Sequence, residues 1–531
     1  MGLAMRLRDA RSSTVWWAAL AVLCGLLILP LFVVDMPPLM DYPNHLGRIF
    51  VLASLPQDTV LARFYAPHWS VIPNLALDIV GPLLLHLLPV NVAGRLLIAA
   101  SILLPVLGTV AYQSALGGRW WSFGAGLIAY NNCLLYGFLN FEISLGLALL
   151  IAACWIRWRE AKPARAIIAA AIGAPVLFVC HMMGLVFFAA LIGGAELFIV
   201  YRAVPAGRHV AIRTAAERGA ILALVFCIPV ILYALSALEQ LHGDALFGLA
   251  DKTGHFLAVF VNYNLRLDLT AAAVSIWLPV LLVLLHRGIV PGPAAIAMAL
   301  LTVAYIAAPY AWKGTSGLDM RFAVMIAFML FAGVLPVRMP FWPGIVIAVV
   351  LGALFTTRMA LLVTVWAAHA SDLRDLRTVL APVQPGQTVY VLSAGPDDAP
   401  AYWQANPNWR RLSNGVRTDT HLGALVLFEH RAFWPGEFDF PAQQPIRTLE
   451  PFTTLIHRTG LPRDRKAAIN ADLCGFDYLL MTEADALPSL PPDRFRLLDQ
   501  KGFAALYAIT ACETRPGLQG VVAHHGASSS P

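Results

Sequence analysis

Long apolar segments are the feature that most restricts how this chain can fold. Runs of about 20 apolar residues recur between residues 15 and 368, and a helix of that length crosses the hydrocarbon core of a bilayer. Hydrophobic residues make up 59% of the 531 residues and charged residues only 13%, whereas soluble domains carry about 25% charged residues. Residues 1–368 are therefore predicted to form a polytopic α-helical membrane module.

The basic residues indicate how the spans are oriented. Residues 157–166 and 201–218 are strongly basic, and the positive-inside rule places such loops in the cytoplasm. The 37 Lys and Arg against 31 Asp and Glu therefore do not indicate a nucleic-acid partner. Counting outward gives about 11 full spans within a range of 11 to 13, and a 12-span arrangement competes although it fits the charges less well. The expected spans are residues 15–34, 92–116, 121–136, 138–157, 165–180, 183–201, 216–238, 270–286, 293–311, 320–336 and 342–360.

This count predicts a multi-pass protein of the bacterial inner (cytoplasmic) membrane, with a cytoplasmic N-terminus and a periplasmic C-terminal part. One apolar piece, residues 72–90, does not fit the alternation and carries Asp78 and His86 in its interior. Polar segments at membrane depth are tolerated where protein covers them or where they line a wet cavity. We expect a juxtamembrane or re-entrant element within an outer loop of residues 35–91.

The C-terminal third has a different pattern, with short apolar runs separated by Pro, Gly and Asp. It predicts a periplasmic α/β domain over residues 370–516, large enough for its own core, followed by a disordered tail over residues 517–531. The expected strands are residues 388–393, 424–429, 478–483 and 504–509, with a helix over 462–472.

Two cysteines stand apart from the five in or near the spans. Cys474 opens one predicted strand and Cys512 closes another. If these strands pair antiparallel, the two cysteines lie side by side, and an oxidising compartment would permit a disulfide. A pair of isolated free cysteines is the alternative.

Unusual polar residues gather on the predicted outer face of the membrane module. Ionisable groups at membrane depth are costly and mark substrate paths or proton chemistry. The candidates for binding a substrate or a lipid phosphate are Asn140, Glu142, His181, Lys313, Asp319 and Arg321. Each has an ordinary structural explanation alone, so their coincidence on one face is the signal.

The stretch "DMPPLMDYPNHLGR", residues 35–48, follows directly on the first span. Asp41 precedes a proline and an apolar pattern with helical spacing, so it could simply cap an amphipathic helix. It could also be a carboxylate at the mouth of a membrane cavity, one turn from His45, where it would take a proton from an acceptor hydroxyl. The two roles are compatible. Asp35 is the competing carboxylate, although it more simply terminates the first span.

Arg321 and Lys313 flank the last outer loop. A guanidinium offers a planar donor fork for phosphate oxygens and an ammonium offers a point charge. Contact with lipid headgroups is the structural alternative. A cationic site here would also stabilise a departing phosphate.

The layout resembles the GT-C superfamily, the polytopic glycosyltransferases that use polyprenyl-phosphate sugars. The resemblance is carried by the acidic motif "MDYPNHL" in the first outer loop, the amphipathic helices after it, the late "GLDMRF" and the domain after the last span. It implies a hexosyl- or pentosyltransferase that inverts the anomeric carbon, with Asp41 as the catalytic base, assisted by His45. Arg321 or Lys313 would hold the lipid phosphate.

The resemblance also implies a polyprenyl-phosphate sugar as donor, a lipid, glycan or protein as acceptor, and membrane lipids as surroundings. Many members need no metal, so no cofactor is expected, and a divalent metal requirement is left open. The sequence departs from the paired Asp-Glu form of several branches because Tyr42 follows Asp41.

Two other classes compete with the enzyme. A transporter or flippase of a lipid-linked solute would need polar groups at the midplane and broken helices repeated in two halves, neither of which the sequence displays. A non-catalytic envelope-assembly protein would use the C-terminal domain to bind glycans. Whether Asp41 faces a cavity together with Arg321 and His181 discriminates between these hypotheses.

Overall fold

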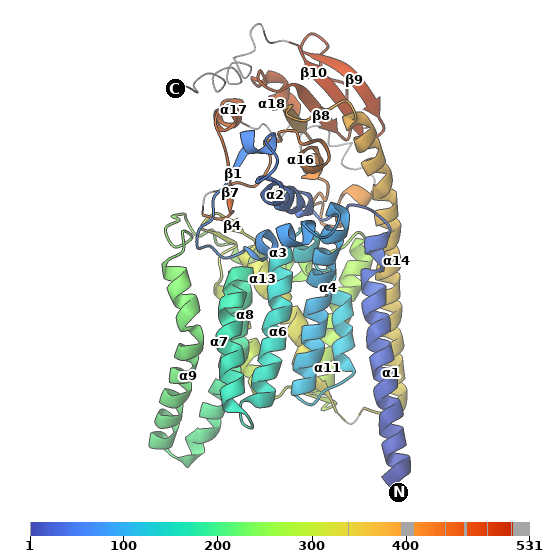
Figure 1. The fold of residues 1–531 in the computed structure, drawn as a ribbon. Coiled ribbons are helices and arrows are strands. Elements are labelled where there is room, and N and C mark those ends of the chain that lie inside the picture. Colours follow the sequence, from blue (N-terminus) through green and yellow to red (C-terminus); the bar gives the residue numbers. More distant parts are fainter. Residues whose placement is uncertain are drawn as a thin grey trace.

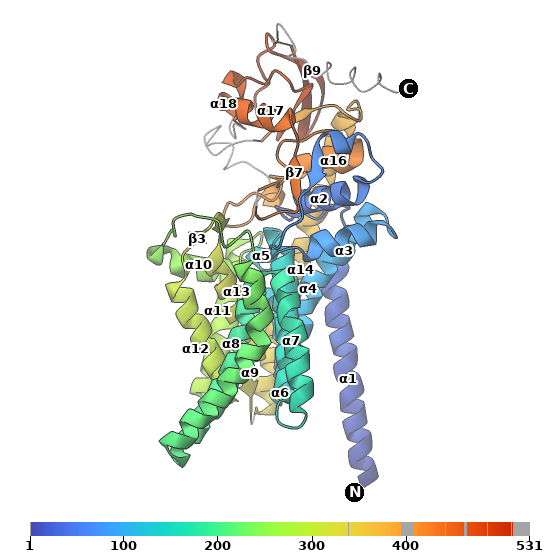
Figure 2. The ribbon, with the colours of Figure 1, turned by 60° about the vertical axis from the view of Figure 1, so that its left-hand side comes forward.

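The computed structural model describes residues 2–337, 339–393, 408–440, 442–460, 465–485, 487–510 and 512. A bundle of long helices carries the C-terminal region on one end, which we call the upper end, while the N-terminus lies at the opposite end (Figure 1). The tail predicted over residues 517–531 lies outside the described residues. Turned by 60°, the molecule shows the C-terminal region as a separate layer above the bundle (Figure 2).

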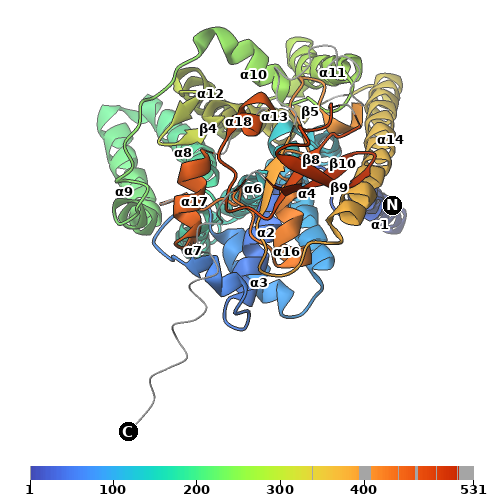
Figure 3. The ribbon, with the colours of Figure 1, turned by 90° about the horizontal axis from the view of Figure 1, so that it is seen from above.

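Eight helices of the described chain are long and apolar enough to cross a membrane, as expected for a multi-pass membrane protein. They are α1 (Gly2–Ile28), α4 (Val90–Ala115), α6 (Leu139–Trp158), α7 (Pro163–Cys180), α8 (Met182–Ala203), α9 (Arg208–Ala234), α11 (Leu265–Leu284) and α14 (Phe341–Leu380). Within the bundle, α6 packs against α4, α7 and α8, whereas α9 lies at the rim (Figure 3).

Two of the predicted spans are shorter helices, α12 (Gly292–Ala307) and α13 (Leu318–Ala332). Helix α13 is buried over nearly its whole length, so protein rather than lipid surrounds it. Its 15 residues therefore need not match a bilayer by themselves.

The helical span predicted over residues 121–136 is wrong. This segment forms a 3-10 helix, η3 (Trp121–Ile128), followed by the four-residue α5 (Asn132–Leu135). Neighbouring helices cover it closely: a Cβ on Gly124 would lie 2.2 Å from Phe331 and one on Gly126 would lie 3.0 Å from Leu23. Irregular backbone at membrane depth is tolerated only under such cover, and apolar composition alone could not distinguish it from a helix.

The loop region after the first span contains α2 (Tyr42–Ser54), η2 (Leu61–Arg63), β1 (Tyr65–Pro67) and α3 (Ala76–Leu85). The segment that broke the alternation, residues 72–90, contains the ten-residue α3 at the upper end of the bundle (Figure 1). Ile79, Val80 and Leu83 are exposed on it, whereas Asp78 is buried. The apolar face thus points outward while the charge points into the protein.

The C-terminal region contains a four-stranded sheet in the order β6-β8-β10-β9, in which β6 is parallel to β8 and the other pairs are antiparallel. Its strands are β6 (Val389–Leu392), β8 (Tyr478–Thr482), β9 (Phe495–Lys501) and β10 (Ala504–Ile509). The predicted strand over residues 424–429 is wrong, because these residues form α16 (Leu425–His430). A short buried apolar segment has the same sequence pattern whether it forms a strand or a helix.

Shorter elements complete the described chain. The 3-10 helices are η1 (Leu29–Phe32), η4 (Val204–Ala206), η5 (Leu249–Asp251), η6 (Asn408–Arg410) and η7 (Leu422–Ala424). The helices are α10 (Lys252–Ala258), α17 (Phe452–Thr459) and α18 (Arg465–Asn470). The strands are β2 (Gly288–Ile289), β3 (Ala311–Trp312), β4 (Thr315–Ser316), β5 (Leu335–Pro336) and β7 (Ile446–Thr448).

The loop region and the C-terminal region are joined, although about 380 residues separate them in sequence. Strand β1 pairs antiparallel with β7, with Tyr65 opposite Thr448. The Arg431 guanidinium donates to both carboxylate oxygens of Asp58. The C-terminal region is therefore anchored on the same loop region that carries the acidic motif.

A disulfide joins Cys474 to Cys512 and closes a loop of 38 residues. The antiparallel pairing of β8 with β10 brings the two cysteines together. Replacing both by serine should destabilise this sheet by about 3 to 4 kcal/mol, the value expected for a loop of that length.

Hydrogen exchange of the β8 and β10 amides, measured by mass spectrometry on the full-length protein, would report this loss as faster exchange. Cys227→Ser is the matched control, because Cys227 is a free, exposed cysteine on α9. Equal exchange in the double variant and the control would contradict the prediction.

Candidate functional site

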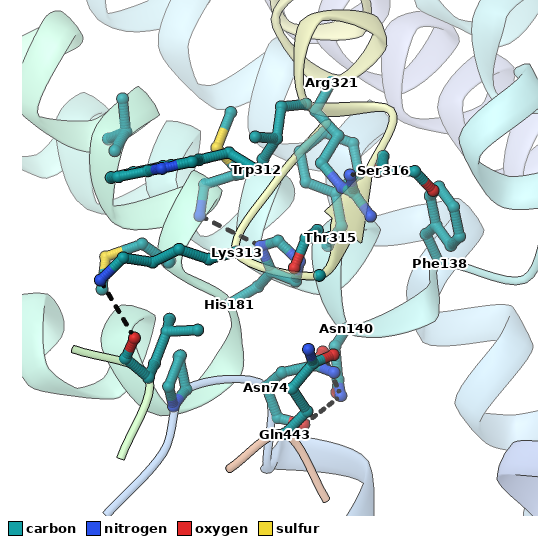
Figure 4. Close-up of a pocket in the computed structure, with 18 of the residues that line it drawn as sticks. Asn74, Phe138, Asn140, His181, Trp312, Lys313, Thr315, Ser316, Arg321 and Gln443 are labelled. Carbon is teal, nitrogen blue, oxygen red and sulfur yellow. Dashed lines mark hydrogen bonds between the residues drawn. The ribbon is translucent and has the colours of Figure 1, made fainter. Parts of the chain in front are cut away.

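A cavity of ≈ 640 Å³ lies at the upper end of the bundle, beneath the C-terminal region. Six of the eight predicted site residues line it: Asp41, His45, Asn140, His181, Lys313 and Arg321. Figure 4 shows Trp312, Lys313 and Arg321 on one side of this pocket and Asn74, Asn140 and Gln443 on the other. Loops distant in sequence thus contribute to a single space.

The backbone around Asp41 is fixed by the turn before α6. The amide of Asp41 donates to the Tyr136 carbonyl at 3.1 Å, and the amide of Met40 donates to the Leu135 carbonyl at 3.0 Å. Gly137 makes this approach possible, because a Cβ there would lie 2.8 Å from the amide nitrogen of Asp41. The position of Asp41 is therefore set by two segments that pack without an intervening side chain.

The Asp41 carboxylate is not used as a helix cap. Asp41 occupies the N-cap position of α2, yet its side chain accepts no hydrogen bond from the helix amides. Instead its Oδ1 lies 3.1 Å from Nδ1 of His421, and the Asp41 side chain is 13% exposed. Among the described contacts, the Asp41 side chain therefore does not cap α2, the structural role that the sequence also allowed.

His45 is held by a buried ion pair. Arg48 donates to His45 Nδ1 at 3.0 Å and to Asp78 at 2.6 Å. An arginine can only donate, so Nδ1 of His45 accepts and the proton of the neutral ring resides on Nε2. Burial lowers the pKa of His45 well below its ordinary value, and the charges of Arg48 and His421 lower it further. His45 therefore lines the cavity with a neutral imidazole.

A second carboxyl group lies beside this ion pair. Glu437 is buried, and a Cβ on Gly47 would lie 2.9 Å from its Oε2. Burial raises the pKa of Glu437 well above its ordinary value, although the charge of Arg48 opposes the shift. Arg48 thus feels the charge of its ion-pair partner Asp78 and also that of Glu437.

Arg321 is a buried cation without a carboxylate within ion-pair distance in the described chain. Its Nη1 donates to the Ser316 carbonyl at 2.6 Å, its guanidinium lies 4.3 Å above the Phe138 ring, and its Nε has no hydrogen-bond partner among the described residues. The charge of Asp41 acts on it electrostatically. A buried guanidinium with unused donors is a ready site for an anion.

Lys313 lies at the tip of the hairpin formed by β3 and β4. Lys313 and Gly314 both have positive φ values, 50° and 72°, as a two-residue type I′ turn requires. The Lys313 ammonium donates to the backbone carbonyls of Leu238 and Glu239. It adds a second cation to the cavity wall.

His181 and Asn140 are held by the backbone around them. His181 joins α7 to α8, and its Nδ1 accepts from the Met183 amide at 3.1 Å, so Nε2 is the nitrogen left for a ligand. Asn140 donates to the Asn74 carbonyl at 2.8 Å and accepts from the Leu77 amide at 3.0 Å. Asn140 therefore fixes the segment that leads into α3 as well as lining the cavity.

Glu142 and Asp319 do not line the cavity. Glu142 is fully buried in the first turn of α6, without a charged partner in the described chain. Asp319 is also fully buried, and it accepts from Lys252 Nζ at 2.9 Å while lying 2.7 Å from His255 Nδ1. The contacts of Asp319 connect α10 to the start of α13, the helix that also carries Arg321.

The charges on the cavity wall are unequal. Of the described lining residues, Asp41 is acidic and Lys313 and Arg321 are basic, with His45 and His181 beside them. The wall thus has a surplus of positive charge, which suits a ligand with an anionic group. Within the described residues, no three His, Cys, Asp or Glu side chains form a group that would hold a metal ion.

Sequence reasoning missed His421, Gly137 and the aromatic residue Phe438. The Phe438 ring lies 5.0 Å from the His421 ring and 6.2 Å from the His45 ring. Nothing in the sequence around residue 421 indicated a functional histidine, because its contact with Asp41 joins residues 380 positions apart. The unusual "YGFLN" turn at Gly137 was the only available signal.

Comparison with known proteins assigns no family. The sequence matches no protein-family model and none of the curated proteins with which it was compared. Its function must therefore be inferred from the site itself.

Removing one partner of the buried Arg48–Asp78 ion pair should destabilise the protein. Arg48→Met leaves a buried carboxylate without its partner and should cost about 3 to 5 kcal/mol of unfolding free energy. The double variant Arg48→Met/Asp78→Leu removes both charges and should recover most of that loss. Thermal unfolding of the detergent-solubilised protein measures both variants, and a double variant no more stable than the single one would contradict the prediction.

The lowered pKa of His45 predicts a loss of stability in mild acid. The unfolded state binds a proton near pH 6.5 and the folded state resists it, so stability present above pH 6.5 is lost as pH falls toward the folded pKa, at up to about 1.4 kcal/mol per pH unit. His45→Gln removes this term. Its Tm should therefore fall less than that of the wild type between pH 7.5 and pH 5. Parallel losses in both proteins would show that His45 is not the titrating group.

Proposed function

We propose that this chain is a membrane glycosyltransferase that moves a sugar from a polyprenyl-phosphate donor to a hydroxyl of a lipid, glycan or protein acceptor. The reaction takes place at the periplasmic face of the bacterial inner membrane. One observation carries the proposal: a partly exposed carboxylate, Asp41, and a buried guanidinium without a carboxylate partner in the described chain, Arg321, line the same cavity at the upper end of the bundle.

The proposed chemistry assigns one task to each charge. Asp41 takes the proton of the acceptor hydroxyl as the oxygen attacks the anomeric carbon of the donor sugar. The bond between that carbon and the phosphate oxygen breaks on the opposite face, so the configuration inverts and polyprenyl phosphate leaves with the electron pair. Arg321 and Lys313 stabilise the negative charge that develops on the leaving phosphate.

The shape of the cavity supports an amphiphilic donor. Apolar side chains line the part next to the helices, among them Met182 and Val186 of α8 and Ala304 and Ala307 of α12. Polar amides line the part below the C-terminal region, namely Asn74, Asn140 and Gln443. A prenyl chain would occupy the first part and the sugar the second, with the phosphate at Arg321 and Lys313.

A transporter is less well supported than an enzyme. Solute transporters place their binding sites near the bilayer midplane, between discontinuous helices of two repeats. The charged groups of this cavity come from loops and helix ends at the upper end of the bundle. That position suits chemistry between a membrane-bound donor and an acceptor arriving from the aqueous side.

The test compares the envelope glycans of a deletion strain complemented by wild-type or variant protein. Asp41→Asn should lower the rate of glycan modification by about 10² to 10⁴-fold, the usual contribution of a general base. Arg321→Met should lower it strongly, and Arg321→Lys should restore part of the loss because it returns the charge without the planar fork.

Arg213→Met serves as the control, because Arg213 forms only an exposed pair with Glu217 in the described chain. All variants are compared at equal amounts of protein in the membrane. Complementation by Asp41→Asn equal to that by the wild type would eliminate Asp41 as the base and, with it, this proposal.

A further inference from the structure

We infer that His421 is the positioning residue of Asp41: its Nδ1–H group, supplied by the C-terminal region, holds the Met40 backbone and the Asp41 carboxylate together at the edge of the cavity. The role of Asp41 as base rests on the proposed function, whereas the positioning contact stands on geometry alone. His421 therefore belongs to the site without lining the cavity, because the described lining includes Asp41 and not His421.

The contacts of His421 fix which nitrogen carries its proton. Nδ1 lies 3.1 Å from the Met40 carbonyl oxygen and 3.1 Å from Asp41 Oδ1. A carbonyl and a carboxylate only accept hydrogen bonds, so Nδ1 must be protonated in this arrangement. This N–H group thus donates to the Met40 carbonyl and lies within ion-pair distance of the Asp41 carboxylate, so it is close to two consecutive residues.

The imidazole is held in place from several sides. The Phe438 ring meets it edge to face at 5.0 Å, and the Trp434 ring lies at 6.3 Å. His421 directly precedes η7, which packs against α2. A side chain restrained in this way loses little entropy when it orients a partner, which is the requirement for precise positioning.

Asp41 has this contact in place of a cap on its own helix. A carboxylate at an N-cap position ordinarily accepts from the amides of the first turn, and the Asp41 side chain makes no such bond. The histidine offers an alternative donor on the side of the C-terminal region. The strand pair β1–β7 and the Arg431–Asp58 pair hold the C-terminal region on the loop region that carries Asp41. His421 can therefore contact Asp41 only when the C-terminal region is docked.

The test requires no knowledge of the sugar. Dicyclohexylcarbodiimide, an apolar reagent that attacks protonated carboxyl groups, is applied to the full-length protein in liposomes over a range of pH. Mass spectrometry follows labelling of the peptide that contains Asp41. Losing an N–H donor favours the protonated form of a carboxyl group, so labelling should then extend to higher pH.

Two amide side chains of different length provide the decisive comparison. His421→Asn places its NH₂ group where Nδ1 was, whereas His421→Gln places it one bond further out. The pH of half-maximal labelling should rise by about one unit in His421→Gln and stay near the wild-type value in His421→Asn. His430→Asn is the control, because His430 Nδ1 meets only a backbone carbonyl, that of Val383, in the described chain.

The same variants are compared in the glycan assay, where His421→Gln should lower the rate by about 10- to 100-fold, as loss of a group that orients a functional ligand does, and His421→Asn should restore most of it. Identical labelling curves for the Asn and Gln variants would overturn the inference. The two proposals fail separately: full complementation by Asp41→Asn with a shifted labelling curve in His421→Gln defeats the enzyme proposal alone, whereas an inactive Asp41→Asn with an unshifted curve defeats the positioning role alone.

Discussion

The buried ion pair between Arg48 and Asp78 is the interaction on which the upper end of this molecule depends. Two charges removed from water are stable only when they are paired closely and bonded further, and here the pair joins α2 to α3. It allows α3 to lie across the top of the bundle with its charge inward and its apolar residues outward. It also fixes α2, which begins at the motif that carries Asp41, and Arg48 donates to the ring of His45, which burial keeps neutral.

The cavity below α2 is formed where several such fixed segments meet. Each segment is held by contacts that a ligand does not use: Asp319 secures the start of α13, Asn140 secures the approach to α3, and Gly137 lets the turn before α6 press against Asp41. The groups left over are a carboxylate and two cations. These three groups line the cavity, and each is also held by a contact with the protein.

Much of the organisation was predictable from sequence because it follows from simple periodicities. Apolar length predicted the membrane helices, and the charge pattern correctly set α3 apart from the spans. The errors occurred where composition is ambiguous. Residues 121–136 are apolar but lie under other helices as a 3-10 helix, and residues 424–429 are a buried helix rather than a strand. In both segments the surrounding protein determined the backbone conformation, and a local sequence pattern carries no information about that surrounding protein.

By itself, the sequence determined that the chain forms long apolar helices, that its polar residues gather at the ends of these helices, and that Asp41 and Arg321 belong to the same face. These conclusions depend on the cost of placing charge or unpaired backbone in an apolar medium, which acts on every residue separately. Only the tertiary structure decided that Asp41 meets His421, that burial keeps His45 neutral, and that Asp319 joins α10 to α13 without facing the cavity. Those outcomes depend on contacts of a few ångströms between segments far apart in the chain, and such contacts exist only after the segments have packed.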